Sequence, residues 1–310
     1  MTRKSASRTA EFMALFRAIE TSRRPAGTRL FVDQLARGFL GGSLGVVADL
    51  FRLPLLGAAV ERVIDHRWPG ARTSGVARTR LIDDAMKDAL RDGFQQFVIL
   101  GAGFDSRAYR LPGLASTRVF EVDHPATLAM KKERLDALLG ALPRHVAFVA
   151  VDLDGEDLAH ALEGAGFEPR SRSFFLWEGV TNYLTPGAVD STLQFVAATG
   201  VPGSRILFTY VHRGLLDGSK VFAGTKHLFA TLKRSGEPWT FGLEPAELSA
   251  YLEERGLELV WDLGASDYRA HYMGPAARRM AGYEFYRAAM AEVRAIGSAS
   301  AGATGAGAQP

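Results

Sequence analysis

Short runs of consecutive apolar residues recur through the middle of the chain, and segments with helical spacing separate them. The first run, Phe97–Leu100, is wholly apolar, which is typical of a strand buried on both faces of a parallel sheet. Similar runs predict strands over residues 119–122, 146–151, 174–177 and 206–210. The intervening patterns predict helices over residues 125–142, 155–164 and 186–199. This alternation predicts right-handed crossovers and a doubly wound α/β sheet with helices on both faces.

The chain before Asp92 has helical spacing throughout, and the chain after the fifth strand contains further candidate strands. Helices are predicted over residues 11–21, 31–40, 48–67 and 73–91, with Pro54 opening a new helix inside the third of these ranges. Strands are predicted at residues 257–261 and at about 268–272. With the five runs above, they predict a seven-stranded, mostly parallel sheet of the Rossmann-like class.

These elements divide the chain into segments. We expect residues 1–92 to form an N-terminal helical cap or lid and residues 93–296 to form the Rossmann-like core. A helical cap is expected as an insertion at about residues 214–243. Residues 297–310 are Gly, Ala and Ser with no large apolar side chain, and they are expected to form a disordered tail.

Composition narrows the function classes. The absence of cysteine excludes disulfides, thiolate metal sites and a cysteine nucleophile. The apolar runs are short and broken by charges, so we expect no membrane partner, and with no export signal we expect a cytoplasmic protein. The net charge of +3 is spread along the chain and interleaved with acids, so we expect no nucleic-acid partner.

The first predicted strand ends in a glycine turn. Gly101 and Gly103 allow a ligand to approach the backbone without a Cβ in the way. A dinucleotide fingerprint requires a third glycine at position 106, where this chain has Ser106. The preceding Asp105 favours a cationic or hydroxyl-bearing ligand over a pyrophosphate. S-adenosylmethionine, which carries an ammonium and a sulfonium but no phosphate, is such a ligand, and a nicotinamide cofactor is disfavoured.

Acidic residues follow the second and third predicted strands. Asp123 lies 20 residues after Gly103, the offset at which a carboxylate meets ribose hydroxyls, or else it caps the next helix. Asp152 could accept a hydrogen bond from an adenine amine with Leu153 against the ring, or it could be a helix N-cap. No histidine lies near Asp152 and Asp154 to complete a metal site, so no metal is expected.

Charged residues also interrupt apolar segments elsewhere. Glu178, at the end of the fourth predicted strand, would be costly to bury without a partner, so we expect it at the ligand, near the methionine ammonium. Arg78 and Arg80 interrupt the apolar face of their helix, and one of them could hold the methionine carboxylate. The alternative is that both arginines are solvated.

Several segments together resemble the leucine carboxyl methyltransferase-like family, in particular its bacterial branch of S-adenosylmethionine-dependent methyltransferases. They are VILGAGFDSRAYRL (98–111), FEVDHPATLAMKK (120–132), WEGVTNYLTP (177–186), RAIETSRRPAGTRLFVD (17–33) and VARTRLIDD (76–84). The resemblance covers most of the chain up to about Pro186 and implies a class I methyltransferase fold with S-adenosylmethionine as cofactor.

The resemblance also implies site roles. It places Arg78 on the methionine carboxylate, Gly101 and Gly103 in the turn, Asp123 on the ribose, Asp152 and Leu153 at the adenine, and Glu178 near the amino-acid end. A lysine that some members use near the N-terminus has no matching position, and Arg17 or Arg23 stands nearest. The resemblance further implies methylation of oxygen, often a carboxylic oxygen, on substrates ranging from a protein C-terminus to polyketide intermediates.

The residues leave the methyl acceptor open. A carboxylate acceptor needs a cation, and Arg213, Lys220 or an N-terminal arginine could supply it. A phenol needs a general base, and His212, just after the fifth strand, is the best-placed histidine, unless it is a surface loop residue. Tyr183 and Tyr210 could line the acceptor pocket. Apolar residues in the expected cap suggest an apolar acceptor: Phe222, Leu228, Phe229, Trp239 and Phe241.

The sequence therefore predicts an O-methyltransferase acting on a carboxylate or phenol of a small metabolite, such as a polyketide or aromatic acid in secondary metabolism. The alternative is a non-catalytic protein on the same fold that binds S-adenosylmethionine or a partner. Asp123 and Glu178 together favour the enzyme.

Overall fold

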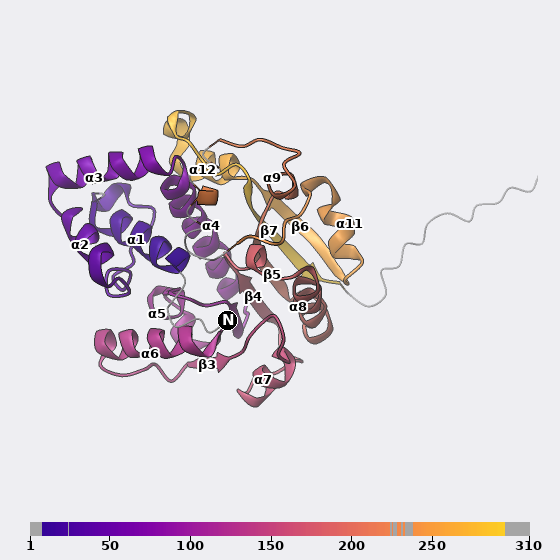
Figure 1. The fold of residues 1–310 in the computed structure, drawn as a ribbon. Helices are drawn as coiled ribbons and strands as arrows, with labels where there is room; N and C mark the ends of the chain where they lie inside the picture. Colours follow the sequence, from indigo (N-terminus) through magenta and orange to yellow (C-terminus); the bar gives the residue numbers. More distant parts are fainter. Residues whose placement is uncertain are drawn as a thin grey trace, which may run out of the picture.

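The computed structural model describes residues 8–294 apart from residues 24, 224, 226–227, 231 and 233–237. A seven-stranded sheet forms its centre, in the order β3-β2-β1-β4-β5-β7-β6 (Figure 1). The strands are β1 (Gln96–Leu100), β2 (Arg118–Asp123), β3 (Val146–Ala150), β4 (Ser173–Trp177), β5 (Arg205–Val211), β6 (Leu257–Leu263) and β7 (Tyr286–Val293). β1 to β5 pair in parallel, and β7 runs antiparallel to both β5 and β6. The predicted mostly parallel α/β sheet is confirmed.

Helices cover both faces of this sheet (Figure 1). The helices are α1 (Arg8–Arg23), α2 (Gly42–Leu50), α3 (Pro54–Arg67), α4 (Ala71–Arg91), α5 (Arg107–Arg110), α6 (Pro125–Leu139), α7 (Leu158–Gly164), α8 (Pro186–Thr199), α9 (Arg213–Leu216), α11 (Leu248–Glu253) and α12 (Ala265–Met273). On one face, Ile82 and Met86 of α4 pack into a cluster with Phe97 and Ile99. On the other face, α7 and α8 bury their apolar sides in a second cluster.

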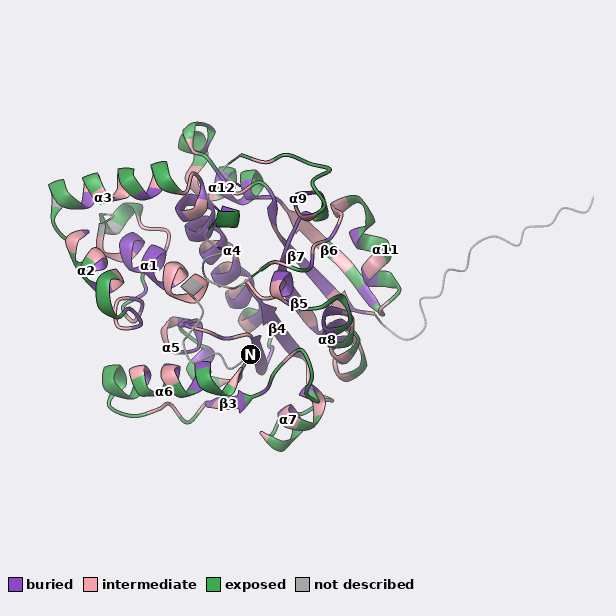
Figure 2. Cartoon of the chain, in the orientation of Figure 1, coloured by how far each residue is buried: buried purple, intermediate pink, exposed green. Residues whose placement is uncertain are grey.

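The N-terminal helices have a core of their own. Leu15, Phe16 and Ile19 of α1 pack with Phe39 and Phe51 in a cluster separate from the two sheet clusters. Figure 2 shows α4 buried against the sheet, whereas α3 presents an exposed side to solvent. Within the part of the chain that the structure describes, every helix is too short or too polar to cross a lipid bilayer.

The predicted strand at residues 268–272 is wrong. These residues lie in α12, where Ala265 and Tyr268 are buried three positions apart and pack against Ala77. The seventh strand is β7, whose run of alanines lacks the β-branched residues typical of strands. β7 is nevertheless a strand because it pairs with β5 on one side and β6 on the other, and this pairing outweighs the weak strand preference of alanine.

The predicted helix at residues 31–40 is also wrong, because these residues form turns and bends. The Asp33 carboxylate accepts hydrogen bonds from the backbone N–H groups of Leu35 (3.1 Å) and Ala36 (3.0 Å). A side chain that bonds to the nearby backbone in this way competes with helix formation. Pro54 opens α3 as predicted, and the single range 48–67 is divided between α2 and α3.

The segment boundaries stay a prediction. Residues 297–310 lie outside the described residues, as does part of the cap expected at residues 214–243. The described part of that cap contributes Leu228 and Leu232 to a small apolar cluster with Phe285 and Tyr286.

Candidate active site

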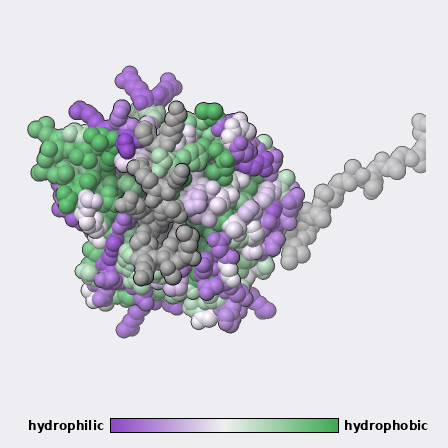
Figure 3. Space-filling model, in the orientation of Figure 1, coloured by the Kyte–Doolittle hydropathy of each residue, from purple (hydrophilic) through white to green (hydrophobic). Residues whose placement is uncertain are grey.

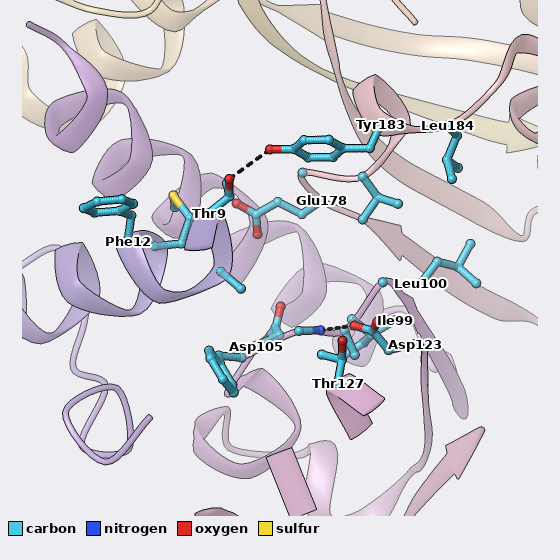
Figure 4. A pocket seen from close by; sticks show the side chains of 18 of the residues that line it. Thr9, Phe12, Ile99, Leu100, Asp105, Asp123, Thr127, Glu178, Tyr183 and Leu184 are labelled. Atoms are coloured by element: carbon cyan, nitrogen blue, oxygen red, sulfur yellow. Dashed lines mark hydrogen bonds between the residues drawn. The ribbon is translucent and has the colours of Figure 1, made fainter. Parts of the chain in front are cut away.

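A cavity of about 730 Å³ lies beyond the carboxyl ends of β1 to β4, where ligands bind in open α/β sheets. Its volume suits a small-molecule site. Residues of α1 and α4 line one side of it, and the side chains lining the other side include Leu228, Leu232, Trp239, Tyr283 and Tyr286. Figure 4 shows lining side chains converging from α1, the ends of β1 and β2, and the segment after β4.

The glycine turn after β1 forms the floor of this cavity. Gly101 and Gly103 have φ of +65° and +39°, in the region that favours glycine. A Cβ on Gly101 would lie 2.3 Å from Cγ2 of Val180, so this position also has no room for a side chain. The turn therefore brings its backbone directly against the cavity, as predicted from the paired glycines.

Asp123 lies at the end of β2 beside this turn (Figure 4). Its Oδ2 accepts a hydrogen bond from the Gly103 N–H (2.6 Å) and its Oδ1 accepts one from the His124 N–H (2.7 Å). The N-cap of α6 is His124, whose Nδ1 accepts a hydrogen bond from the Ala126 N–H (3.2 Å). The capping alternative for Asp123 is therefore wrong, and its carboxylate lies fixed on the cavity wall.

Asp152 and Leu153 follow β3 and line the same cavity. The Asp152 Oδ1 accepts a hydrogen bond from the Asp154 N–H (3.1 Å) in a local turn. The N-cap of α7 is Asp157. The N-cap alternative for Asp152 is therefore wrong, and the side chain is exposed at the cavity rim.

Glu178 is held between arginines. Its Oε1 lies 2.8 Å from Nε of Arg78, and its Oε2 lies 2.9 Å from Nη1 of Arg107. Burial by itself would raise the pKa of Glu178, but the charges of Arg107 and Arg78 outweigh it and lower the pKa. Glu178 is thus an ionised carboxylate on the cavity wall, as its position after an apolar strand predicted.

Asp105 also lines the cavity, but Arg107 occupies both of its oxygens. The Arg107 N–H donates to Oδ1 (2.7 Å) and the Arg107 guanidinium donates to Oδ2. Burial would raise the pKa of Asp105, but the charges of Arg107, Lys131 and Arg17 lower it to about 2. Arg107 contacts both Asp105 and Glu178 and so joins them into one network. Sequence reasoning missed this residue, and only its position two residues after Asp105 pointed to it.

The described cavity lining contains Arg78 and Arg17 as its arginines. Arg17 is bound to Asp33 (2.8 Å) and to the Phe104 carbonyl oxygen (2.5 Å), so it supports the loop after β1. Arg78 lies with its guanidinium 4.7 Å from the Tyr286 ring centroid. Arg80 points elsewhere and pairs with Asp84 (2.8 Å). Of the two arginines considered on this helix, the structure brings Arg78 to the site.

The remaining wall is aromatic. Side chains far apart in the sequence meet there: Phe12, Trp68, Tyr183, Trp239, Tyr283 and Tyr286. The Thr9 and Tyr183 hydroxyls lie 2.9 Å apart and join α1 to the segment after β4 (Figure 4). Apart from Tyr183 and Trp239, sequence reasoning missed these residues, because aromatic residues at helical spacing are usually core.

Two buried N–H donors in this wall and beside it have no partner among the residues that the structure describes. They are Nε1 of Trp239 and Nδ2 of Asn182. Asn182 is 1% exposed and its Oδ1 accepts from the Tyr286 hydroxyl (3.3 Å), while its backbone oxygen accepts from Thr240 (2.8 Å). Trp239 packs 6.2 Å from the Tyr286 ring. The Trp239 donor therefore belongs to the aromatic end of the cavity, whereas Asn182 lies outside the cavity lining, in contact with Tyr286.

His212, Tyr210 and Arg213 lie outside the cavity lining, which corrects the expectation that they act on the acceptor. Thr209 of β5 accepts from the Gly179 N–H (2.8 Å) at the site. Tyr210 therefore points to the opposite face of the strand, where its hydroxyl donates to Asp262 (2.8 Å). His212 caps α9, with Nδ1 accepting from the Gly214 N–H (3.0 Å), and burial lowers its pKa. Arg213 pairs with Glu247 on the surface (2.9 Å).

Comparison with known families agrees with this geometry. A family model described as leucine carboxyl methyltransferase matches residues 10–197, more than half of the chain. The chain belongs to the leucine carboxyl methyltransferase family. The resemblance noted in the sequence is thereby confirmed, and this family member is an S-adenosylmethionine-dependent methyltransferase.

Individual relatives carry the same assignment. A protein from Frankia alni, provisionally named an S-adenosyl-L-methionine-dependent methyltransferase, is 38% identical over 74% of this chain and 77% of its own length. A protein of the same name from Mycobacterium marinum is 34% identical over 83% of this chain and 84% of its own. A crystal structure of a provisionally named methyltransferase from Thermobifida fusca has a TM-score of 0.58 at 17% identity, covering 94% of this chain and 97% of the other. This last likeness supports the fold alone.

Proposed function

We propose that this methyltransferase transfers the methyl group of S-adenosylmethionine to a carboxylate oxygen of a small aromatic or otherwise apolar acid, such as an aromatic or polyketide acid. The observation that carries the proposal is the division of one cavity into a charged half at the sheet and an aromatic half beside it. The charged half suits the cofactor and the aromatic half suits the body of the acceptor.

The charged half has the donors and acceptors that the cofactor requires. Asp123 would accept from the ribose hydroxyls, and Asp152 with Leu153 would border the adenine. Glu178 would face the ammonium, and the guanidinium nitrogens of Arg78 not bound to Glu178 would hold the methionine carboxylate. When bound, the cofactor supplies a methyl carbon already activated by the sulfonium.

The protein's own contribution is alignment and exclusion of water. The Thr9–Tyr183 contact, at 2.9 Å, closes the cavity on the side of α1. An acceptor oxygen that is already ionised fits this half, because the described lining of the aromatic half contains no histidine to act as a base. His124, the histidine of the described lining, is the cap of α6 beside Asp123. A phenol, with a pKa of about 10, would need a base there, whereas a carboxylate needs none.

The Trp239 Nε1–H, which has no partner among the described residues, also supports an anionic oxygen acceptor. Leaving a buried N–H without a partner costs about 1–3 kcal/mol. A carboxylate has two oxygens, so one could accept the hydrogen bond from Trp239 while the other receives the methyl group. This arrangement would hold the acceptor in place without a cation from Arg213 or Lys220.

Thermal unfolding and a transfer assay test the proposal. S-adenosylmethionine and S-adenosylhomocysteine should each raise the unfolding temperature and NAD should not, since only a ligand bound to the folded state stabilises it. With tritium-labelled S-adenosylmethionine, benzoate and aliphatic acids should yield base-labile methyl esters, whereas phenol should remain unlabelled. Stabilisation by the cofactor with transfer only to phenols or amines would reject the carboxylate acceptor.

A further inference from the structure

The outward side of α3 is an exposed apolar surface. Leu55 is 88% exposed, Val63 65% and Leu56 50%. Leu53, just before the helix, is 50% exposed, and Val46 on the neighbouring α2 is 61% exposed. Figure 3 shows apolar side chains gathered over α2 and α3. We call these five residues the α2–α3 surface. Large exposed apolar patches commonly mark a binding surface.

Helix geometry separates this surface from the side that holds α3 in place. Leu55 and Val63 are eight residues apart and so share one side of the helix. The opposite side carries Gly57 and Ile64, both buried, and Ile64 packs in the N-terminal cluster. A Cβ on Gly57 would lie 2.8 Å from the Phe51 carbonyl oxygen, so this side is closely packed. The fold therefore does not need the outward leucines and valine.

The exposed charged side chains on and just before α3 are basic, and the nearby acids are paired with arginines. Among the described side chains of α3, the exposed ones are either apolar or basic, and the basic ones are Arg62, His66 and Arg67. Arg52, just before the helix, is also exposed. The acids of α3 lie to the side, where Glu61 and Asp65 are 2.8 Å and 2.6 Å from the Arg72 guanidinium. The exposed acid of α2, Asp49, pairs with Arg37 at 2.6 Å. The outward face is thus apolar and cationic.

We propose that the α2–α3 surface docks the protein on an anionic lipid bilayer, with α3 lying in the interface. A helix with leucines on one part of its face and arginines beside them binds such surfaces through apolar burial and attraction to anionic headgroups. A second copy of the chain fits less well, because a symmetric contact would bring Arg52, Arg62 and Arg67 close to their own equivalents. The face is the ridge of a helix, so it offers no groove to a partner helix.

This binding mode goes beyond the proposed methyl transfer and revises the expectation of no membrane partner. That expectation rested on apolar runs too short to span a bilayer, but a helix that lies on a membrane needs no such run. Trp68 follows α3 directly, lines the cavity and packs 5.7 Å from Phe12. The docked surface therefore lies next to the aromatic half of the site.

Co-sedimentation of the full chain with lipid vesicles tests the proposal. The protein should bind vesicles containing about one third phosphatidylglycerol at least about tenfold more tightly than vesicles of phosphatidylcholine alone, and added salt should weaken this binding. The Leu55→Glu/Val63→Glu double variant should lose at least about tenfold in vesicle affinity. The matched control is Val260→Glu, a 52% exposed valine on β6, and it should bind like the wild type.

Three outcomes would overturn the proposal. They are no binding of the wild type to anionic vesicles, equal binding of the double variant, or a wild-type dimer in ultracentrifugation that the double variant abolishes. The last outcome would assign the surface to self-association. S-adenosylhomocysteine affinity, measured by calorimetry on every variant, should stay unchanged, so that failure of the cofactor site would be recognised separately.

Discussion

The two halves of the cavity are built in different ways. The charged half comes from residues directly after consecutive parallel strands, such as Gly101, Asp123, Asp152 and Glu178. The aromatic half comes from α1, the segment after α3, the partly described cap and the start of β7. In the first, apart from Arg78 on α4, these residues lie at the same edge of the sheet, where the parallel strands end. In the second, each position depends on a different packing contact.

This difference predicts which substitutions affect one half of the cavity and leave the other half unchanged. The side chains of the charged half are fixed by hydrogen bonds and ion pairs, for example Asp123 with Gly103 and Glu178 with Arg78. The aromatic half is fixed by ring contacts, such as that of Trp239 with Tyr286, and it keeps the buried Trp239 N–H without a partner among the described residues. Substitutions in the first half should therefore affect folding and cofactor binding, whereas substitutions in the second should affect the acceptor.

The largest effect is expected from Glu178→Ala, because it leaves Arg78 and Arg107 buried without this carboxylate. The free energy of unfolding should fall by about 3 kcal/mol, in the range for breaking a buried ion pair. Urea unfolding measures it. Glu178→Gln, which keeps the shape and can still accept a hydrogen bond, should lose less. If the alanine variant were as stable as the wild type, Glu178 would not contribute to stability, and its only role would be contact with the ligand.

The stability of the charged half should also depend on pH through Glu121. This residue is fully buried on β2, 2.8 Å from Lys131, whose ammonium donates to the Ala102 oxygen in the glycine turn (3.3 Å). Burial raises the pKa of Glu121 to about 7 from an ordinary value of 4.5. The folded state then holds the proton more tightly, so the unfolding free energy should fall between about pH 4.5 and 7, by on the order of 2 kcal/mol.

Urea unfolding at a series of pH values checks this, with Glu121→Gln as the comparison. The variant should lose the decline between about pH 4.5 and 7. If the unfolding free energy declined equally in the wild type and the variant, ionisable groups other than Glu121 would be responsible.

Asp123→Ala should weaken S-adenosylhomocysteine binding about tenfold or more, or about 1.4 kcal/mol. The physical reason is the loss of the carboxylate that would accept from the ribose hydroxyls. Calorimetry gives the affinity. Asp136→Ala, which removes an exposed carboxylate from α6, serves as the control and should bind normally. If Asp123→Ala and Asp136→Ala bound S-adenosylhomocysteine with equal affinity, the ribose would not bind at the end of β2.

Trp239→Phe should separate the two halves with a smaller effect. The ring stays, but the unpartnered N–H is lost, so the unfolding free energy should rise by up to about 1 kcal/mol while benzoate ester formation falls. S-adenosylhomocysteine affinity should not change. Trp261→Phe, a change on β6 outside the cavity lining, controls for the loss of an indole. A loss of cofactor affinity in Trp239→Phe would contradict the division of the cavity.

The smallest effect is expected from Arg213→Ala. This arginine lies on the surface, paired with Glu247 and outside the cavity lining. Exposed ion pairs contribute little, so methyl transfer and cofactor affinity should stay at wild-type values. A reduced rate of methyl transfer at saturating cofactor would indicate that Arg213 does act on the acceptor.

The sequence by itself determined the sheet and the charged half. Apolar runs flanked by glycine and acids are local signals, and the parallel topology brings the carboxyl ends of such strands to one edge. Gly101, Gly103, Asp123, Asp152 and Glu178 could therefore be placed at one site before any contact was known. The local signals misled at β7, where alanine is a weak strand former, and at Asp33, whose carboxylate bonds to the backbone in place of a helix.

Only the tertiary structure decided the acceptor half. Phe12, Trp68 and Tyr286 are separated by long stretches of chain, and nothing local distinguishes them from core aromatics. Because side chains alternate along β5, Tyr210 points away from the site. His212 is the N-cap of α9. Long-range packing fixes which face of an element meets a cavity, and one sequence read residue by residue does not contain that information.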